Sequence, residues 1–155
     1  MTQQHEIPQD FAEIINAAGD GWVKANGLRF LRATRDVVVA ELEIGPQHRQ
    51  AYGIVHGGVY CGIVETLASV GAAVNVMPDG RSAVGLENNT SFIRAVREGK
   101  LRAEARPVTR GRRSHVWEVA VRDEQERTVA TGRVRMLILE QDAAVAGEKV
   151  RLQDE

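Results

Sequence analysis

Residues 50–76 constrain the fold more than any other stretch of this sequence. A loop leads into the turn His56-Gly57-Gly58, and the residues from there to Val76 contain no proline and a single charged side chain. At ~100° per residue their apolar side chains gather on one arc, made up of Val59, Ile63, Thr66, Leu67, Val70, Val74 and Met77. We therefore expect one long helix that packs this arc on the core. The two glycines let another group approach bare N–H donors at its start.

The opposite face of this helix carries its one ionisable group, Glu65. The neighbours of Glu65 at helical spacing are small: Gly58, Cys61, Gly62, Ala68, Ser69 and Ala72. A solvated face would surround a glutamate with long polar side chains, so small neighbours indicate that another chain or a ligand packs closely there. A carboxylate enclosed in this way is poorly hydrated, as a general base or nucleophile requires. A lone helical glutamate is more often structural, but the glycine turn ahead of Glu65 favours a functional role.

Composition limits the range of partners. The chain has 155 residues and a formal net charge of -1, so we expect one domain with no field that attracts nucleic acid or an anionic membrane. No membrane span or signal peptide is expected, because no window reaches ~18 uninterrupted apolar residues and the start of the chain is polar. Cys61 is the only cysteine, which fits a reducing, cytoplasmic compartment. His48 and His56 have no carboxylate at ligand spacing, so no metal site is expected.

The remaining elements are mostly strands. A short amphipathic helix is predicted at 10–19, capped by Asp10 and ended by Gly19. Alternating patterns predict strands at 26–33, 36–44, 82–95, 100–107, 114–122 and 129–139. This order predicts an α+β fold in which an antiparallel sheet of about six strands wraps the long helix, with the last four strands in a meander. The domain would cover residues 1–140, followed by a polar, mobile tail at 141–155.

The turn and the acid together resemble a known family. His56-Gly57-Gly58 entering a central helix, with Glu65 nine residues after the histidine, is similar to the PaaI-like group of hotdog-fold acyl-CoA thioesterases over about residues 20–140. Glutamate at this position resembles the branch with the Arthrobacter-type 4-hydroxybenzoyl-CoA and the 1,4-dihydroxy-2-naphthoyl-CoA thioesterases. The resemblance implies hydrolysis of an aromatic or medium-chain acyl-CoA without a cofactor. It also implies a homodimer with shared active sites, agreeing with the small residues around Glu65, and a homotetramer built from two such dimers.

The resemblance implies roles for four residues near the turn. Glu65 is the nucleophile or the general base, and these alternatives stay open. The Gly57 amide polarises the thioester carbonyl and Gln50 assists at the thioester. Ser69 orients water or the intermediate, in a place where the hydroxybenzoyl enzyme has threonine. Apart from the resemblance, we expect His56 to orient the turn through a side-chain bond to the backbone, with a direct catalytic role as the less favoured alternative.

Substrate contacts are expected at the turn and in two cationic segments. The residues concerned are Gly58, Arg94, Gly111, Arg112, Arg113 and Ser114. Arginine offers bidentate contacts to the phosphates of coenzyme A, and the resemblance favours the 110–114 loop over Arg94. The alternative is that these arginines only protect the solvated ends of strands.

Two other functions compete with thioester hydrolysis. An acyl hydratase or dehydratase usually pairs a histidine with an acid, and no such pair is evident around Glu65. A non-catalytic acyl-CoA-binding or regulatory module could dispense with the acid, which this chain has. A serine hydrolase is not supported, because the sequence contains no G-x-S-x-G motif.

Overall fold

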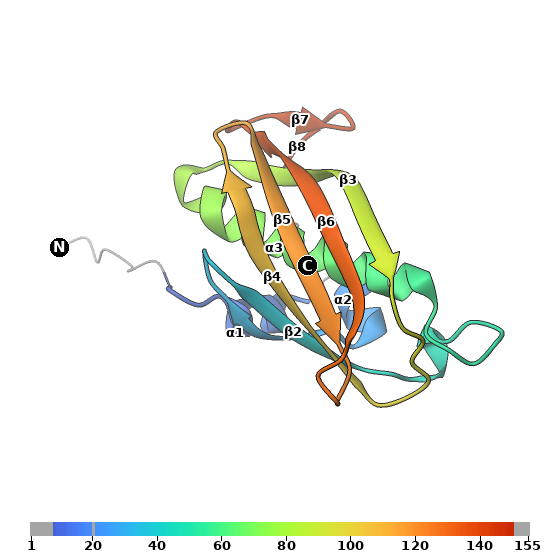
Figure 1. Cartoon of the computed structure of the whole chain (residues 1–155). Helices are drawn as coiled ribbons and strands as arrows, with labels where there is room; N and C mark the ends of the chain where they lie inside the picture. Colours follow the sequence, from blue (N-terminus) through green and yellow to red (C-terminus); the bar gives the residue numbers. More distant parts are fainter. Residues whose placement is uncertain (1–7, 20, 151–155) are drawn as a thin grey trace.

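The protein folds as one long helix against a strongly curved antiparallel sheet (Figure 1). In the computed structural model, residues 8–19 and 21–150 are described. Helix α3 (Gly57–Val76) lies on one side of a six-stranded sheet. The strands are β1 (Arg29–Ala33), β2 (Val38–Glu43), β3 (Ser82–Phe92), β4 (Lys100–Arg110), β5 (Ser114–Arg122) and β6 (Thr128–Leu139). The predicted α+β class, with its central helix and six-stranded antiparallel sheet, is confirmed.

The core lies between α3 and the side chains that alternate inward from the sheet. In β5 these are His115, Trp117, Val119 and Val121, all buried as the alternation predicts. Trp117 is fully buried, and its ring lies where a Cβ on Gly71 would stand, within 2.6 Å. A glycine at 71 therefore lets the helix backbone approach the ring to a distance that no other residue permits.

The predicted meander is wrong for one strand. The strand order is β1-β2-β4-β5-β6-β3, so β3 pairs with β6 at the far edge of the sheet, and β2 pairs with β4. Alternation along a strand shows which side chains face inward, but it does not show which strand lies beside it. The pairing of β2 with β4 brings Leu42 opposite Leu101 and Ala40 opposite Ala103, so two apolar faces meet there.

Strand β3 contains a bulge. Gly85 pairs with Met136 and Glu87 pairs with Arg135, so Leu86 is one residue more than β6 offers opposite it. Residues three apart in a regular strand point to opposite faces. Because of the extra residue, Gly85 and Asn88 instead share the face that carries the buried Met136 and Val134. This is the face turned toward α3.

The small residues of α3 pack closely, but against their own chain. Helix α2 (Gly21–Asn26), which the sequence patterns did not predict, places the Trp22 ring 2.1 Å from where a Cβ on Gly62 would lie. Ala68 and Ala72 are fully buried within the single chain. The sequence predicted that another chain or a ligand packs on this face, and the structure shows that α2 of the same chain covers part of it.

The predicted apolar arc is correct in its centre and wrong at its end. Val59, Ile63 and Leu67 are buried, whereas Met77 is 47% exposed because α3 ends at Val76 and the chain turns into the short 3-10 helix η2 (Met77–Asp79). Gly80 follows with φ 71°, a conformation that glycine adopts without strain. By length and composition alone, Gly57–Asp79 could cross a membrane. Its packing against the sheet accounts for the same apolar character.

The first helix of the chain was predicted correctly, whereas the structure near the end of the chain was not. Helix α1 (Ala12–Ala18) forms as expected, with Asp10 Oδ1 accepting the Ala12 N–H at 2.9 Å, and ends at Gly19. After residue 141, where no structure was expected, the chain forms a hairpin of β7 (Ala144–Val145) and β8 (Glu148–Lys149). The last part of the predicted tail, residues 151–155, lies outside the described residues, as do residues 1–7 at the start of the predicted domain.

The β5–β6 turn contains a carboxylate whose ionisation should affect stability. Asp123 is 5% exposed and accepts the N–H groups of Gln125 and Arg127, each at 3.0 Å. The hydrogen bond from the Arg127 side chain is the largest cause that lowers the pKa of Asp123, against the opposing effect of burial. A folded-state pKa below the unfolded value of ~3.9 stabilises the fold above about pH 5, and this is lost as pH falls through the folded-state pKa.

Asp123→Asn should therefore weaken the acid dependence of stability between about pH 5 and about pH 2. Denaturant midpoints measured against pH for the wild type and the variant test this. Glu124→Gln, on the same turn, serves as the control and should keep the wild-type profile. Parallel curves for the wild type and Asp123→Asn would contradict the assigned role.

Candidate active site

The turn before α3 leaves one backbone amide available. His56 is the N-cap of α3, and its Nδ1 accepts the Gly58 N–H at 2.8 Å. The Val59 N–H bonds to the His56 carbonyl at 2.9 Å. Among the hydrogen bonds of the described residues, none uses the Gly57 N–H. The geometry thus separates the two glycines: Gly58 is engaged by His56, and Gly57 presents a bare donor at the positive end of the helix.

Glu65 lies half-buried between α3 and β3. Its Oε1 stands 2.2 Å from where a Cβ on Gly85 would be, so the carboxylate rests directly on the β3 backbone. Ser69 Oγ donates to Oε1 at 3.5 Å, and Asn88 Nδ2 donates to Oε2 at 3.3 Å. The predicted neighbour Ser69 is thus brought to Glu65. Gly85 and Asn88 were missed, because only the bulge in β3 turns both toward the helix.

Two aromatic rings that were not predicted to be near the site lie beside the turn. The Phe92 ring comes within 2.7 Å of the position a Cβ on Gly57 would occupy, and it is tilted against the Tyr60 ring at 6.1 Å between centroids. Phe92 is 58% exposed. Burial, with a smaller effect of Asp123, raises the pKa of Tyr60 to about 12, so Tyr60 remains an uncharged phenol at neutral pH. The available amide of Gly57 therefore has an apolar wall.

Gln50 lies in the loop ahead of the turn. Its Oε1 accepts the Tyr52 N–H at 2.6 Å, and its backbone N–H bonds to Ile54 O at 2.8 Å. Arg97 Nη1 donates to the Tyr52 carbonyl at 2.7 Å, which ties the loop to the segment after β3. Within the described residues, no hydrogen bond joins Gln50 to Glu65 or to Gly57. One chain therefore does not bring Gln50 into contact with the acid.

A second cluster lies at the other end of α3. A cleft of about 440 Å³ is lined by Arg35, Asp36, Asn75, Val76, Arg81, Arg110, Gly111, Arg112 and His115. Of the predicted phosphate contacts, Gly111 and Arg112 line this cleft. Ser114 closes the turn beneath it by accepting the Gly111 N–H at 2.9 Å, and Arg113 O accepts from Ile138 N. The exposed Arg94 follows β3 and does not line the cleft.

The lining of the cleft is cationic, with four arginines and one acid. Arg110 is held by Asp36 at 2.8 Å and by the Asn75 side chain at 3.3 Å, while Arg81 donates to the Arg112 carbonyl at 3.2 Å. His115 is 4% exposed, and its Nδ1 has no hydrogen-bond partner in the described part of the chain. Burial first, then the charges of Arg110 and Arg81, lowers the pKa of His115, which favours the neutral form of its ring. Arg35, Arg81 and His115 were not predicted, because only the folded chain brings them to Arg112.

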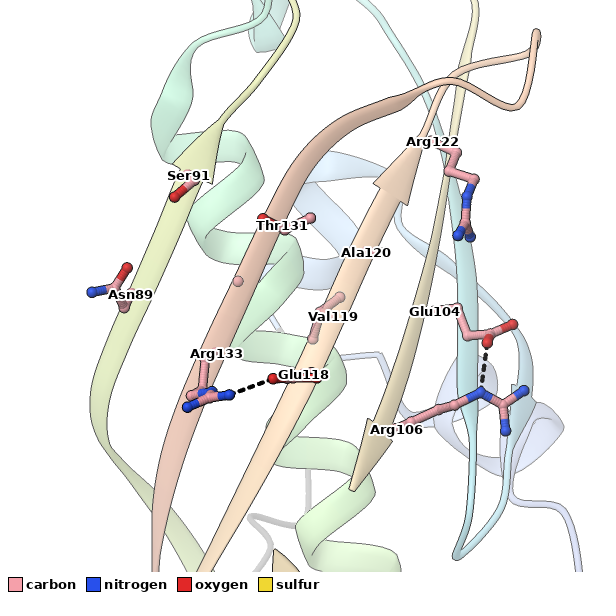
Figure 2. Close-up of a pocket in the computed structure, with 11 residues that line it drawn as sticks. Asn89, Ser91, Glu104, Arg106, Glu118, Val119, Ala120, Arg122, Thr131 and Arg133 are labelled. Carbon is pink, nitrogen blue, oxygen red and sulfur yellow. Dashed lines mark hydrogen bonds and ion pairs between the residues drawn. The ribbon is translucent and has the colours of Figure 1, made fainter. Parts of the chain in front are cut away.

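Another hollow of about 430 Å³ lies on the outer face of the sheet, away from α3 (Figure 2). Asn89, Glu118, Arg122 and Arg133 line it, with Arg133 paired to Glu118. Figure 2 shows α3 behind the strands, so none of the predicted catalytic residues reaches this hollow.

A long helix within a six-stranded sheet, with a half-buried acid on the helix and a glycine turn at its start, defines a hotdog-type protein. The chain belongs to the thioesterase superfamily, whose family model matches residues 52–130. The resemblance seen in the sequence is therefore confirmed at the level of family and fold, and membership supports hydrolase activity.

Individual relatives agree with this assignment. A Mycobacterium tuberculosis protein named as an esterase, Rv1847, is 41% identical over 116 residues, which are 74% of this chain and 83% of that protein. Its solved structure superimposes with a TM-score of 0.76 at 39% identity, covering 78% of this chain and 98% of the other. The proofreading thioesterase EntH of Cronobacter sakazakii is 34% identical over 82% of this chain and 93% of its own length. The E. coli PaaI structure, at 19% identity and TM-score 0.75 over 84% of this chain and 92% of its own, shares the fold.

Gly85→Ala should displace the Glu65 carboxylate. An added Cβ would stand 2.2 Å from Oε1, the far end of a flexible side chain, so the fold should tolerate the change while the acid moves. We expect thioester hydrolysis to fall by about 10-fold or more, because a misplacement of about 1 Å is costly in catalysis. Gly21→Ala is the matched control, since nothing lies within 4 Å of its added Cβ. Unchanged activity in Gly85→Ala would show that the carboxylate position does not matter.

Proposed function

We propose that this protein hydrolyses an acyl-coenzyme A thioester to the free acid and coenzyme A. The observation that carries the proposal is the half-buried Glu65 carboxylate, held between α3 and the β3 backbone, in a protein whose helix also starts with an available amide. Its family is a thioesterase family. Acyl-CoA as the thioester comes from the family resemblance, together with the cationic cleft.

Thioester hydrolysis requires the substrate carbonyl to contact both the Glu65 carboxylate and a Gly57 amide. Glu65 attacks the thioester carbon, giving a mixed anhydride that water then opens, or it takes a proton from a water that attacks directly. In either route the C–S bond breaks, and the sulfur leaves as the thiol of coenzyme A after it gains a proton. The carbonyl oxygen gains negative charge on the way, and the Gly57 N–H at the positive end of α3 is suited to stabilise it.

Helix geometry supports a site shared between two chains. Gly57 and Glu65 are eight residues apart in α3, so they lie about 12 Å apart along one helix axis. A single carbonyl group needs both within about 3 Å. We therefore infer a homodimer in which the Gly57 turn of one chain, with Gln50 and Gly58, meets Glu65 and Ser69 of the other. Association of two dimers into a tetramer is part of the same proposal.

The free edge of β3 is suited to form this dimer. β3 is the last strand of the sheet, so its outer edge has no strand partner among the described residues. Leu86 and Phe92 on this strand are 50% and 58% exposed. Pairing along an edge of this length would cover these side chains and enclose Glu65.

The cationic cleft fits the phosphates of coenzyme A. Gly111 and Arg112 line it together with three further arginines, Arg35, Arg81 and Arg110, and one acid, Asp36. Two acids outside the lining, Asp79 and Glu140, pair with Arg81 and Arg112. Guanidinium groups bind phosphate through paired N–H donors, which favours this place for the nucleotide end. Arg113, Ser114 and Arg94 are kept as proposed secondary contacts. The Phe92 ring beside Gly57 supports an apolar acyl group, aromatic or of medium chain length.

Glu65→Gln should lower kcat by about 100-fold or more on every acyl-CoA that the wild type hydrolyses, because the variant has neither a nucleophile nor a base at this position. Thiol release from a panel of aryl and aliphatic acyl-CoAs measures this and ranks the acyl groups. The amide is nearly isosteric, so the melting temperature should stay near that of the wild type. Full activity in Glu65→Gln, or no release by the wild type from any member of the panel, would contradict the proposal.

Arg112→Ala and Arg81→Ala should raise KM for acyl-CoA by about 10-fold each, the effect of losing a charge-assisted contact. The same variants should leave KM unchanged for the matching acyl-pantetheine, which has no nucleotide. Arg122→Ala, on the outer face of the sheet, is the control and should change neither value. Equal losses on both substrates would place the nucleotide elsewhere.

A further inference from the structure

Asn88 is the only side chain of β3 with a hydrogen bond to Glu65 in the described residues, and no sequence motif points to it. Its Nδ2 lies 3.3 Å from Glu65 Oε2 and 3.0 Å from the backbone oxygen of Cys61, one helical turn earlier. Both of those oxygens can only accept a hydrogen bond. The amide nitrogen of Asn88 must therefore face them, because the flipped amide would place oxygen against oxygen.

The other end of the same amide is also fixed. Thr90 Oγ1 donates to Asn88 Oδ1 at 2.6 Å, the shorter and stronger of the contacts in this group. Thr90 has room to do so because position 132 on β6 is glycine: an added Cβ there would lie 2.9 Å from Thr90 Oγ1 and 2.5 Å from Val64 Cγ1. Thr90 thus donates to Asn88, and Asn88 donates to Glu65, so the three side chains form one continuous series of hydrogen bonds.

The bulge at Leu86 makes this chain possible. It places Gly85 and Asn88 on the same face, so the bare backbone of one supports Oε1 and the amide of the other holds Oε2. Ser69 is left beside Oε1 at 3.5 Å. A carboxylate with one oxygen bound to a fixed donor no longer rotates freely about its terminal torsion, so its second oxygen keeps one direction.

We propose that Asn88 is the positioning residue of this site: it holds Glu65 Oε2 so that Oε1 faces Ser69 and the substrate. The inference rests on the proposed function of Glu65. Asn88 acts through Glu65 and needs no contact with the substrate. The bond is long for one to an ionised group, as is common in unliganded sites, where catalytic hydrogen bonds tighten when substrate binds.

Kinetics on the full-length protein test the inference through the split between kcat and KM. Asn88→Ala should lower kcat about 10-fold with KM within about twofold, the value of one hydrogen bond to a charged group. Asn88→Asp should be worse than Asn88→Ala, because it replaces a donor with a second negative charge beside Glu65. Thr90→Val, which frees the amide oxygen, should fall between the wild type and Asn88→Ala, and Thr90→Ser, which keeps the hydroxyl, should restore most of the activity.

Asn89 provides the matched control. It is the next residue of the same strand, and its side chain lies on the outer face of the sheet (Figure 2). Asn89→Ala and Asn89→Asp make the same chemical changes away from Glu65, so both should keep kcat within about twofold of the wild type. Equal losses at positions 88 and 89, or a loss in Asn88→Ala that appears only in KM or only in the melting temperature, would overturn the inference in favour of a merely structural role.

Crystal structures of the wild type and Asn88→Ala give a readout that needs no substrate. We expect the Glu65 carboxylate to rest on Gly85 in the wild type and to rotate away in the variant, while the backbone of β3 is unchanged. An unmoved carboxylate would overturn the inference even if activity fell. If Glu65→Gln remained fully active, the proposed function would fail, and the two structures would still decide whether Asn88 positions the acid.

Discussion

Close approach between α3 and the chain around it is the constraint on which the rest of this structure depends. At several places a glycine removes the side chain that would hold two segments apart, and three of these contacts are Gly71 with the Trp117 ring, Gly62 with the Trp22 ring, and Gly85 with the Glu65 carboxylate. The first contact buries apolar surface between α3 and the sheet, and the second does so between α3 and α2. The third uses the same device to bring an acid against bare backbone. The packing of α3 and the position of its acid therefore both depend on glycines that allow close approach.

The bulge in β3 adds a hydrogen-bond donor, Asn88, to the place where Gly85 meets Glu65. If β3 ran regularly through Leu86, with no unpaired residue, Asn88 would point to the outer face, where Glu87 and Arg135 lie. Glu65 would then have only Ser69 as a side-chain donor on the inner face. Bulges commonly occur beside active sites, because they redirect a side chain without breaking the strand. The position of β3 at the edge of the sheet places this irregular strand where a second chain can approach it.

Much of the fold could be predicted from local patterns, whereas the site could be predicted only in part. The period of α3 and the alternation in β5 identified the buried Leu67 and Trp117, because burial repeats along each element at a fixed interval. Glu65 and Ser69 could be paired in advance, since they lie four apart on one helix. Asn88 and Arg81 could not, because their places depend on a bulge and on strand neighbours, which no local period records. The same reason explains the error over the place of β3. Helix α2 was missed because its six residues are too few to establish a helical period.

The two tryptophans of the chain lie in contrasting surroundings, so their fluorescence reports on two different parts of the structure. Trp117 is fully enclosed in the core, whereas Trp22 is 37% exposed and rests on Gly62 at the outer side of α3. Emission from the first changes only when the whole core opens to water. Emission from the second also responds when α2 lifts from the helix beneath it, so the two signals separate a local loosening over the Glu65 helix from complete loss of the fold.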